Sequence, residues 1–216
     1  MLPYFKKLPF VLDEDISSWL LTLSKKLRAD HTDTAIHLFR REHPDRYNAP
    51  VKWYIEDHID EEDNILNEVK EITSSILECI QIPHRVYGQS HMPSILYQPI
   101  GSSLATHVDH PDPDFDVNSE IGHEIGRSVA LSIPLNYGVE EDPTVFYESY
   151  NTEIEASRCY YERNGVYLIN TYAYHGTNHI KNERYTFQIS FDLDMFSPDT
   201  DLDKIVTAGF PIISLK

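Results

Sequence analysis

The chain has 216 residues, of which 41% are hydrophobic and 12% aromatic, enough for the core of one compact domain. Its 18 Lys and Arg residues against 35 Asp and Glu residues give a formal net charge of -17, which repels phosphate backbones and argues against nucleic acid as a partner. No apolar run approaches the roughly 18 residues of a membrane helix, and two cysteines indicate neither a disulfide framework nor a Cys-based zinc site. We therefore expect a cytoplasmic protein that does not associate with membranes.

Two amphipathic helices are predicted in the first part of the chain. Apolar residues recur at spacings of three and four over residues 13–29 and again, more clearly, over residues 60–80. Acidic residues precede each stripe and Pro83 follows the second, as expected at helix ends. The sequence thus predicts an N-terminal helical region, residues 1–84, that packs on the remainder.

After residue 84 the pattern changes to short runs rich in Val, Ile, Tyr, Thr and Phe, separated by turn-forming residues. The predicted strands cover residues 85–88, 94–100, 105–108, 128–136, 144–150, 157–162, 166–170 and 185–193. Eight short strands suit a double-sheet jelly roll, also called a double-stranded β-helix. The expected fold class is mainly β with N-terminal helices, an α+β arrangement in a single domain, with the core at residues 85–196 and a C-terminal extension at 197–216.

A possible metal site begins at His107 and Asp109. Residues i and i+2 of a strand project to the same face, so both side chains can reach one ion while Val108 points away. His175, on a distant strand, would complete a 2-His-1-carboxylate triad, which leaves three positions of an octahedral ion open. This set of ligands suits Fe(II).

Two further histidines allow an alternative interpretation. His107 with His110, or His175 with His179, would suggest a zinc site. The β-propensity around them places those partners on opposite faces or in loops, and no helical H-E-x-x-H motif is present. The pattern therefore favours the triad over a zinc hydrolase.

The pattern resembles that of the Fe(II)/2-oxoglutarate-dependent dioxygenase superfamily: H-x-D, an intervening stretch, a second His, and an Arg or Lys about ten residues later. Here Arg184 lies nine residues after His175. The resemblance covers roughly residues 85–195, about half the chain, and includes a central strand at 127–136. It implies Fe(II) held by His107, Asp109 and His175, with 2-oxoglutarate as co-substrate and O2 as oxidant.

The resemblance also implies which residues hold the co-substrate. Arg184 would bind the far carboxylate of 2-oxoglutarate, a task that suits its planar, permanently charged fork. Thr186 gives R-x-T, similar to the R-x-S form of the motif. Tyr97 stands where many members place a tyrosine, on the strand before H-x-D, and is a further candidate to contact the co-substrate.

Asp109 bears on the type of reaction, because members of the superfamily that halogenate their substrates replace this carboxylate with a small residue. The resemblance therefore implies hydroxylation or a related oxidation such as demethylation or desaturation, with 2-oxoglutarate converted to succinate and CO2. We expect the substrate to be a small molecule, a free amino acid or an amino-acid side chain, in a peptide for example.

Two features are candidates for contact with the substrate. Arg127 is a candidate, on the predicted central strand. The acidic loop 110–120 is either a lid that favours a cationic substrate or a solvated loop. Two other functions are left open: a cupin-like protein that binds metal without 2-oxoglutarate, and an interaction protein with a vestigial site.

Overall fold

The computed structural model describes residues 4–32, 36–37, 50–60, 64–79, 84–86, 93–107, 129–149, 154–171, 173–193 and 212–213. Asp109, Arg127 and the acidic loop 110–120 lie outside the described residues, so the predictions made for them are not tested by the fold.

Both predicted helices are confirmed. Helix α1 spans Glu14–Asp30, and the Asp13 side chain caps its start by accepting a hydrogen bond from the Asp15 N–H. Helix α2 spans Asn64–Glu78 and buries the stripe that contains Leu66, Val69 and Ile72. A short 3-10 helix, η2 (Ile55–Asp57), lies between them in the chain.

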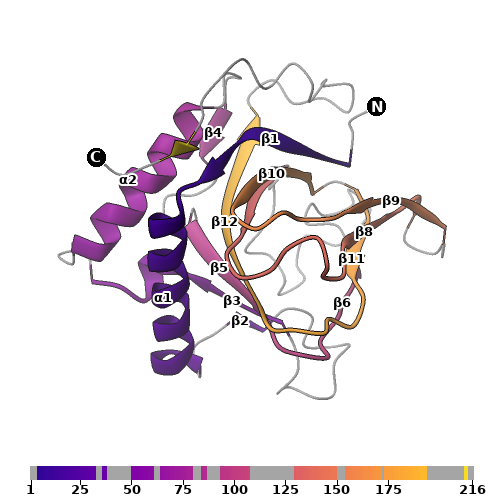
Figure 1. The fold of residues 1–216 in the computed structure, drawn as a ribbon, viewed down its shortest axis with the longest axis horizontal. Coiled ribbons are helices and arrows are strands. Elements are labelled where there is room, and N and C mark those ends of the chain that lie inside the picture. Colours follow the sequence, from indigo (N-terminus) through magenta and orange to yellow (C-terminus); the bar gives the residue numbers. More distant parts are fainter. Residues whose placement is uncertain are drawn as a thin grey trace, which may run out of the picture.

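Two β-sheets form the body of the protein (Figure 1). The large sheet has the strand order β13-β1-β10-β7-β12-β5-β3-β2, with β4 also paired to β12. Its strands are β1 (Phe5–Leu12), β2 (Ile36–His37), β3 (Val51–Tyr54), β4 (His84–Val86), β5 (Pro93–Gln98), β7 (Val129–Pro134), β10 (Gly165–Asn170), β12 (Arg184–Leu193) and β13 (Ile212–Ile213). The small sheet, in the order β6-β11-β8-β9, has the strands β6 (Leu104–His107), β8 (Thr144–Tyr147), β9 (Glu155–Cys159) and β11 (His175–Thr177).

The path of the chain between the sheets is that of the predicted jelly roll. From β5 to β12 the chain crosses repeatedly between the layers, except that the hairpin β8–β9 lies within the small sheet: β5, β7, β10 and β12 belong to the large sheet, and β6, β8, β9 and β11 to the small one. All pairings among these eight strands are antiparallel. The two helices cover the outer face of the large sheet, on the side away from the small sheet (Figure 1).

The residues at the two ends of the chain also join the large sheet. Strand β1 pairs antiparallel with β10, and β13 pairs parallel with β1. The sequence analysis did not predict β1, although Leu8, Phe10 and Leu12 alternate there with exposed residues. Pro9 and two lysines interrupt this alternation of buried and exposed residues. The segment forms a strand because it pairs with β10, which the local sequence does not reveal.

Buried side chains form two apolar clusters. The larger lies between the helices and the large sheet and includes Leu20, Val69 and Phe187. The smaller contains side chains from both sheets, among them Phe146 of β8 and Tyr167 of β10, and therefore lies between the sheets. Strands β5, β7 and β10 in the middle of the large sheet are thus covered on both faces, which explains their runs of buried residues.

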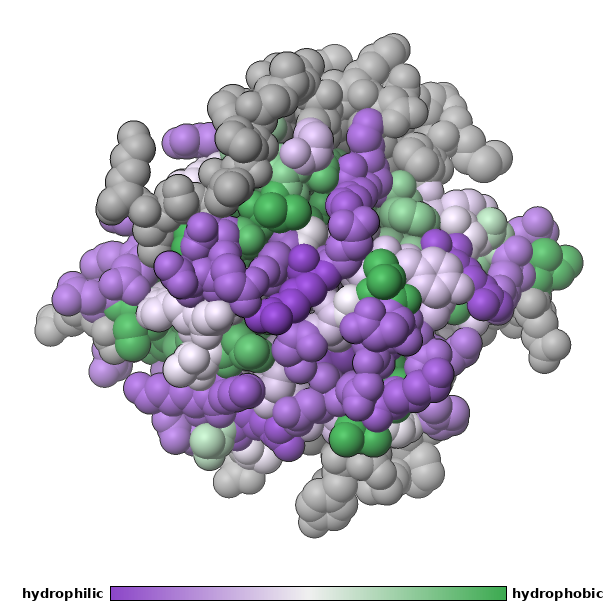
Figure 2. Space-filling view, viewed as in Figure 1, coloured by the Kyte–Doolittle hydropathy of each residue, from purple (hydrophilic) through white to green (hydrophobic). Residues whose placement is uncertain are grey.

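The surface is mainly hydrophilic on the face drawn in Figure 2, where apolar residues form only small, separate patches. Among the described residues, the exposed large apolar side chains are Val11, Ile100, Val139, Ile154 and Tyr160. None of the described helices is both long and apolar enough to span a membrane.

The turn into β10 contains a residue with a left-handed backbone. Asn164 has φ 62° and is largely buried, and its side chain accepts a hydrogen bond from Ser17 and donates one to Glu14, both at the start of α1. Its backbone N–H donates to Pro134, and its carbonyl accepts from Leu12. One asparagine therefore connects α1 and β1 to the turn between β9 and β10.

Replacing Asn164 tests this link. Asn164→Gly keeps the backbone conformation and leaves the buried Ser17 hydroxyl without its acceptor, so we expect a loss of about 1 kcal/mol in the free energy of unfolding. Asn164→Ala adds the cost of a Cβ at positive φ and should be less stable than the Gly variant by roughly another 1 kcal/mol. Urea unfolding of the two variants measures the difference, and equal stabilities would contradict the backbone contribution.

Candidate metal and carboxylate site

Two of the predicted metal ligands lie side by side on the small sheet. His107 ends β6 and His175 begins β11, and the two residues are directly paired across these strands. Their ring centroids are 4.3 Å apart. His175 is also paired with the fully buried Phe146, whose ring lies in the cluster between the sheets. Because directly paired residues share a face, both imidazoles face the space between the sheets.

A backbone contact orients the ring of His175. Its Nδ1 lies 2.8 Å from the carbonyl oxygen of Ala173. A carbonyl oxygen can only accept, so Nδ1 carries a proton and donates it in this contact. A histidine that binds a metal through Nε2 is commonly held in this way, by a second hydrogen bond that fixes the ring.

The third predicted ligand, Asp109, lies two residues beyond the described end of β6. Within the described part of the chain, no three His, Cys, Asp or Glu residues are placed to hold a metal ion. The structure therefore brings together the two histidines of the predicted triad, and the position of its carboxylate lies outside the described residues.

Arg184 is the first residue of β12, on the large sheet, and only 1% of it is exposed. Its neighbours Tyr185 and Phe187 pack in the helix-side cluster, so the alternation of the strand turns Arg184 toward the space between the sheets. The guanidinium lies 4.9 Å from the ring centre of Tyr137. Two of its nitrogens, Nε and Nη2, are buried and have no hydrogen-bond partner.

Unpartnered donors on a buried cation are costly, and a carboxylate that accepted from both would remove that cost. Nε and Nη2 form one edge of the guanidinium, the geometry that grips a carboxylate with two parallel hydrogen bonds. The donor set at Arg184 therefore fits a carboxylate ligand.

Thr186 lies two residues along β12 and shares the inner face with Arg184. Its Oγ1 is 2.8 Å from the hydroxyl oxygen of Tyr137. Burial raises the pKa of Tyr137 to about 12, so the phenol keeps its proton at neutral pH. Tyr137 was not predicted from the sequence, because it directly follows the predicted central strand but belongs to no recognisable motif.

Tyr97 is not brought together with Arg184 and Thr186. It is paired with Tyr185 across β5 and β12, and therefore faces the helix layer. Its ring stacks under the guanidinium of Arg28, 4.2 Å from the centroid, and burial raises the pKa of its hydroxyl to about 12. The residue of β5 that shares the inner face with Arg184 is its direct partner, Gln98.

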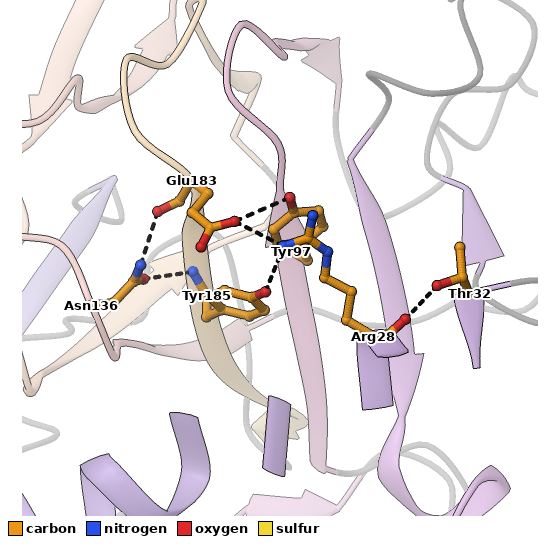
Figure 3. A network of polar contacts seen from close by, with 6 residues as sticks. All are labelled: Arg28, Thr32, Tyr97, Asn136, Glu183 and Tyr185. Atoms are coloured by element: carbon orange, nitrogen blue, oxygen red, sulfur yellow. Dashed lines mark hydrogen bonds and ion pairs between the residues drawn. The ribbon is translucent and has the colours of Figure 1, made fainter. Parts of the chain in front are cut away.

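A polar network behind the sheet fixes the start of β12 (Figure 3). The Asn136 amide donates to the Glu183 carbonyl and accepts from the Tyr185 N–H, so one side chain holds both residues that flank Arg184. Arg28 of α1 donates to the Glu183 carboxylate and to the Tyr185 hydroxyl. The backbone of Arg184 is thereby held from the side opposite its own side chain.

A second contact joins the two sheets next to the site. Gln98 Nε2 donates to Thr177 Oγ1 across the space between the sheets, at 2.9 Å. The same oxygen accepts from the Leu104 N–H at 3.1 Å, where the register of β6 and β11 shifts. Thr177 thus links the strand that carries His175 both to the strand that carries His107 and to the direct partner of Arg184.

Comparison with known proteins gives matches in structure alone. No family model matches the sequence, and no curated protein matches it either. A prolyl hydroxylase from Trichoplax adhaerens, in complex with a hypoxia inducible factor oxygen degradation domain peptide fragment, matches with a TM-score of 0.57 and 15% identity, over 88% of this chain and 84% of that one.

Two further solved structures cover similar shares. HygX from Streptomyces hygroscopicus, with nickel and 2-oxoglutarate bound, matches with a TM-score of 0.55 and 13% identity, over 96% of this chain and 91% of that one. The non-heme alpha ketoglutarate dependent epimerase SnoN from nogalamycin biosynthesis matches with a TM-score of 0.57 and 12% identity, over 87% of this chain and 77% of that one.

These matches define the class of fold. The chain has the jelly-roll fold of the Fe(II)/2-oxoglutarate oxygenases, and the predicted fold class is confirmed. At such identities the likeness concerns the fold alone.

Thr177 offers a test of how the site is held together. Thr177→Val removes the oxygen that accepts from Gln98 and Leu104, and leaves a buried amide donor without a partner. We expect the free energy of unfolding to fall by about 2 kcal/mol. Thr177→Ser keeps the oxygen and should cost less, as chemical denaturation can measure. A Val variant as stable as the Ser variant would rule out the proposed link.

Proposed function

We propose that this protein is an Fe(II)- and 2-oxoglutarate-dependent oxygenase that hydroxylates a small molecule, a free amino acid or an amino-acid side chain. The observation that carries the proposal is Arg184, a buried guanidinium with two unpartnered donors, on the same inner face as Thr186 and across the sandwich from His107 and His175. This combination provides a carboxylate anchor and two metal ligands inside one fold.

In this proposal His107, His175 and Asp109 hold the metal. The contact between His175 and the Ala173 carbonyl orients the imidazole ring, as a second hydrogen bond does for metal-binding histidines. Arg184 binds the far carboxylate of 2-oxoglutarate through Nε and Nη2, while the linked hydroxyls of Thr186 and Tyr137 lie beside it. Burial of Arg184 excludes water and strengthens its interaction with an anion.

Bound Fe(II), 2-oxoglutarate and O2 would supply the oxidising chemistry, with 2-oxoglutarate converted to succinate and CO2. The contribution of the chain is to orient the ligands, hold the co-substrate and keep the site dry. Proteins of this fold include a prolyl hydroxylase in complex with a peptide fragment and an epimerase from nogalamycin biosynthesis, which supports a peptide or small-molecule substrate. Arg127 and the acidic loop 110–120 stay candidates for substrate contact.

The direct test is turnover. The protein is incubated with Fe(II), ascorbate and 2-oxoglutarate, alone and with panels of amino acids and peptides, and succinate is measured. We expect iron-dependent succinate release that a matching substrate stimulates, together with a product heavier by one oxygen atom. A metal-binding protein without oxygenase activity would release no succinate under any of these conditions.

Arg184→Lys tests the co-substrate site. Lysine keeps the charge but lacks the planar fork, so we expect the dissociation constant for 2-oxoglutarate to rise at least about tenfold. Isothermal titration calorimetry on the Mn(II)-loaded protein without oxygen measures this constant. Arg158→Lys, on the surface of β9, is the matched control and should bind like the wild type. Unchanged affinity in Arg184→Lys would exclude Arg184 as the anchor.

Asn136→Ala tests whether the residues that flank Arg184 must be held in place. Loss of both backbone contacts should raise the KM for 2-oxoglutarate by roughly tenfold, since the guanidinium is less well oriented, while kcat changes little. Asn64→Ala, an exposed asparagine at the start of α2, makes the same substitution away from the site and serves as the control. If kcat fell while KM stayed constant, Asn136 would not act through co-substrate binding.

A further inference from the structure

We propose that Glu141 competes with the 2-oxoglutarate carboxylate for Arg184 and thereby sets the affinity of the site for its co-substrate. The inference rests on the proposed function and adds an internal control of co-substrate binding to it. Glu141 places a buried carboxylate beside the guanidinium of Arg184, whose Nε and Nη2 have no hydrogen-bond partner.

The position of Glu141 is fixed by its surroundings. It lies in the segment between β7 and β8, where its N–H donates to the Gly138 carbonyl. Its Oε1 accepts a hydrogen bond from the side-chain amide of Asn182, two residues before Arg184. Only 10% of the Glu141 side chain is exposed. The carboxylate is therefore held next to the start of β12, with its other oxygen directed toward Arg184.

The contact with Arg184 is electrostatic without being a hydrogen bond. Glu141 Oε2 lies 3.9 Å from Arg184 Nη2, beyond hydrogen-bond distance, and neither atom has a hydrogen-bond partner. The guanidinium charge is partly balanced in a buried setting, where Coulomb interactions are strong. Its donors Nε and Nη2 nevertheless stay available to a ligand.

An incoming carboxylate must approach Nε and Nη2 to about 2.9 Å, and this brings it close to Glu141. Like charges at such separations oppose each other strongly inside a protein. Asp142 adds a second buried carboxylate oxygen without a partner to this segment. The affinity for 2-oxoglutarate is therefore the attraction of Arg184 reduced by the repulsion of Glu141. Removing the charge of Glu141 should tighten binding.

The test compares Glu141→Gln with Glu140→Gln. Both remove one negative charge from the same segment, but Glu140 is exposed and makes only the long-range contribution. 2-Oxoglutarate is titrated by calorimetry into the Mn(II)-loaded protein in the absence of oxygen. We expect the dissociation constant of Glu141→Gln to fall by about tenfold or more, and that of Glu140→Gln to stay within about twofold of the wild type.

A second variant keeps the test decisive if Glu141→Gln does not fold. Glu141→Asp withdraws the carboxylate from Nη2 by one methylene and should also tighten binding, by a smaller factor. Weaker or unchanged binding in the folded Glu141 variant would overturn the inference, because Glu141 would then orient Arg184 or play no part. If the wild type and Glu140→Gln both failed to bind 2-oxoglutarate, the proposed function itself would be overturned.

Discussion

A guanidinium buried between two β-sheets imposes the main constraint on this structure. Burial of a charge is tolerated only where the surroundings compensate for it, and Arg184 has an aromatic face beneath it and a carboxylate nearby, but no hydrogen bond for two of its donors. Such a group contributes poorly to the stability of the fold by itself. Its donors fit a carboxylate ligand. The pair of histidines on the facing sheet would place a metal ion near such a ligand.

The rest of the fold holds that group in place from three directions. Asn136 holds the residues on either side of Arg184, and Arg28 connects them to α1 through Glu183 and Tyr185. Thr177 and Gln98 join the two sheets beside it. The N-terminal helix is therefore more than a cover for the large sheet: its last turn contacts the network that positions the candidate site. A change in the packing of α1 would reach the residues on either side of Arg184 through the two hydrogen bonds that Arg28 donates.

Sequence reasoning identified several of these features and missed others for definable reasons. The helices and seven of the eight jelly-roll strands were predictable because periods of 3.6 and 2 residues in hydrophobicity report directly on which face is buried. Strand β11, only three residues long, was not among the predicted strands. Strand β1 was missed because lysines and a proline interrupt its alternation, and because its partner β10 is more than 150 residues away. Tyr97 was assigned to the co-substrate from its place in the motif, but its pairing with Tyr185 turns it toward the helices. Only the register decides that face, since a shift of one residue would reverse it.

The sequence by itself determined the chemistry that is available: the spacing of His107 and Asp109, a distant His175, and an arginine nine residues later are local facts of the chain. Tertiary structure decided how those groups are used. It paired the two histidines, oriented the ring of His175 through a backbone carbonyl, and buried Arg184 beside Tyr137 and Glu141. None of these contacts has a signature in the sequence, because each joins residues whose proximity depends on strand register and on the packing of one sheet against another. Residue types and their spacing set the possible reactions, whereas the long-range contacts set the charge, burial and hydrogen bonding that tune the site.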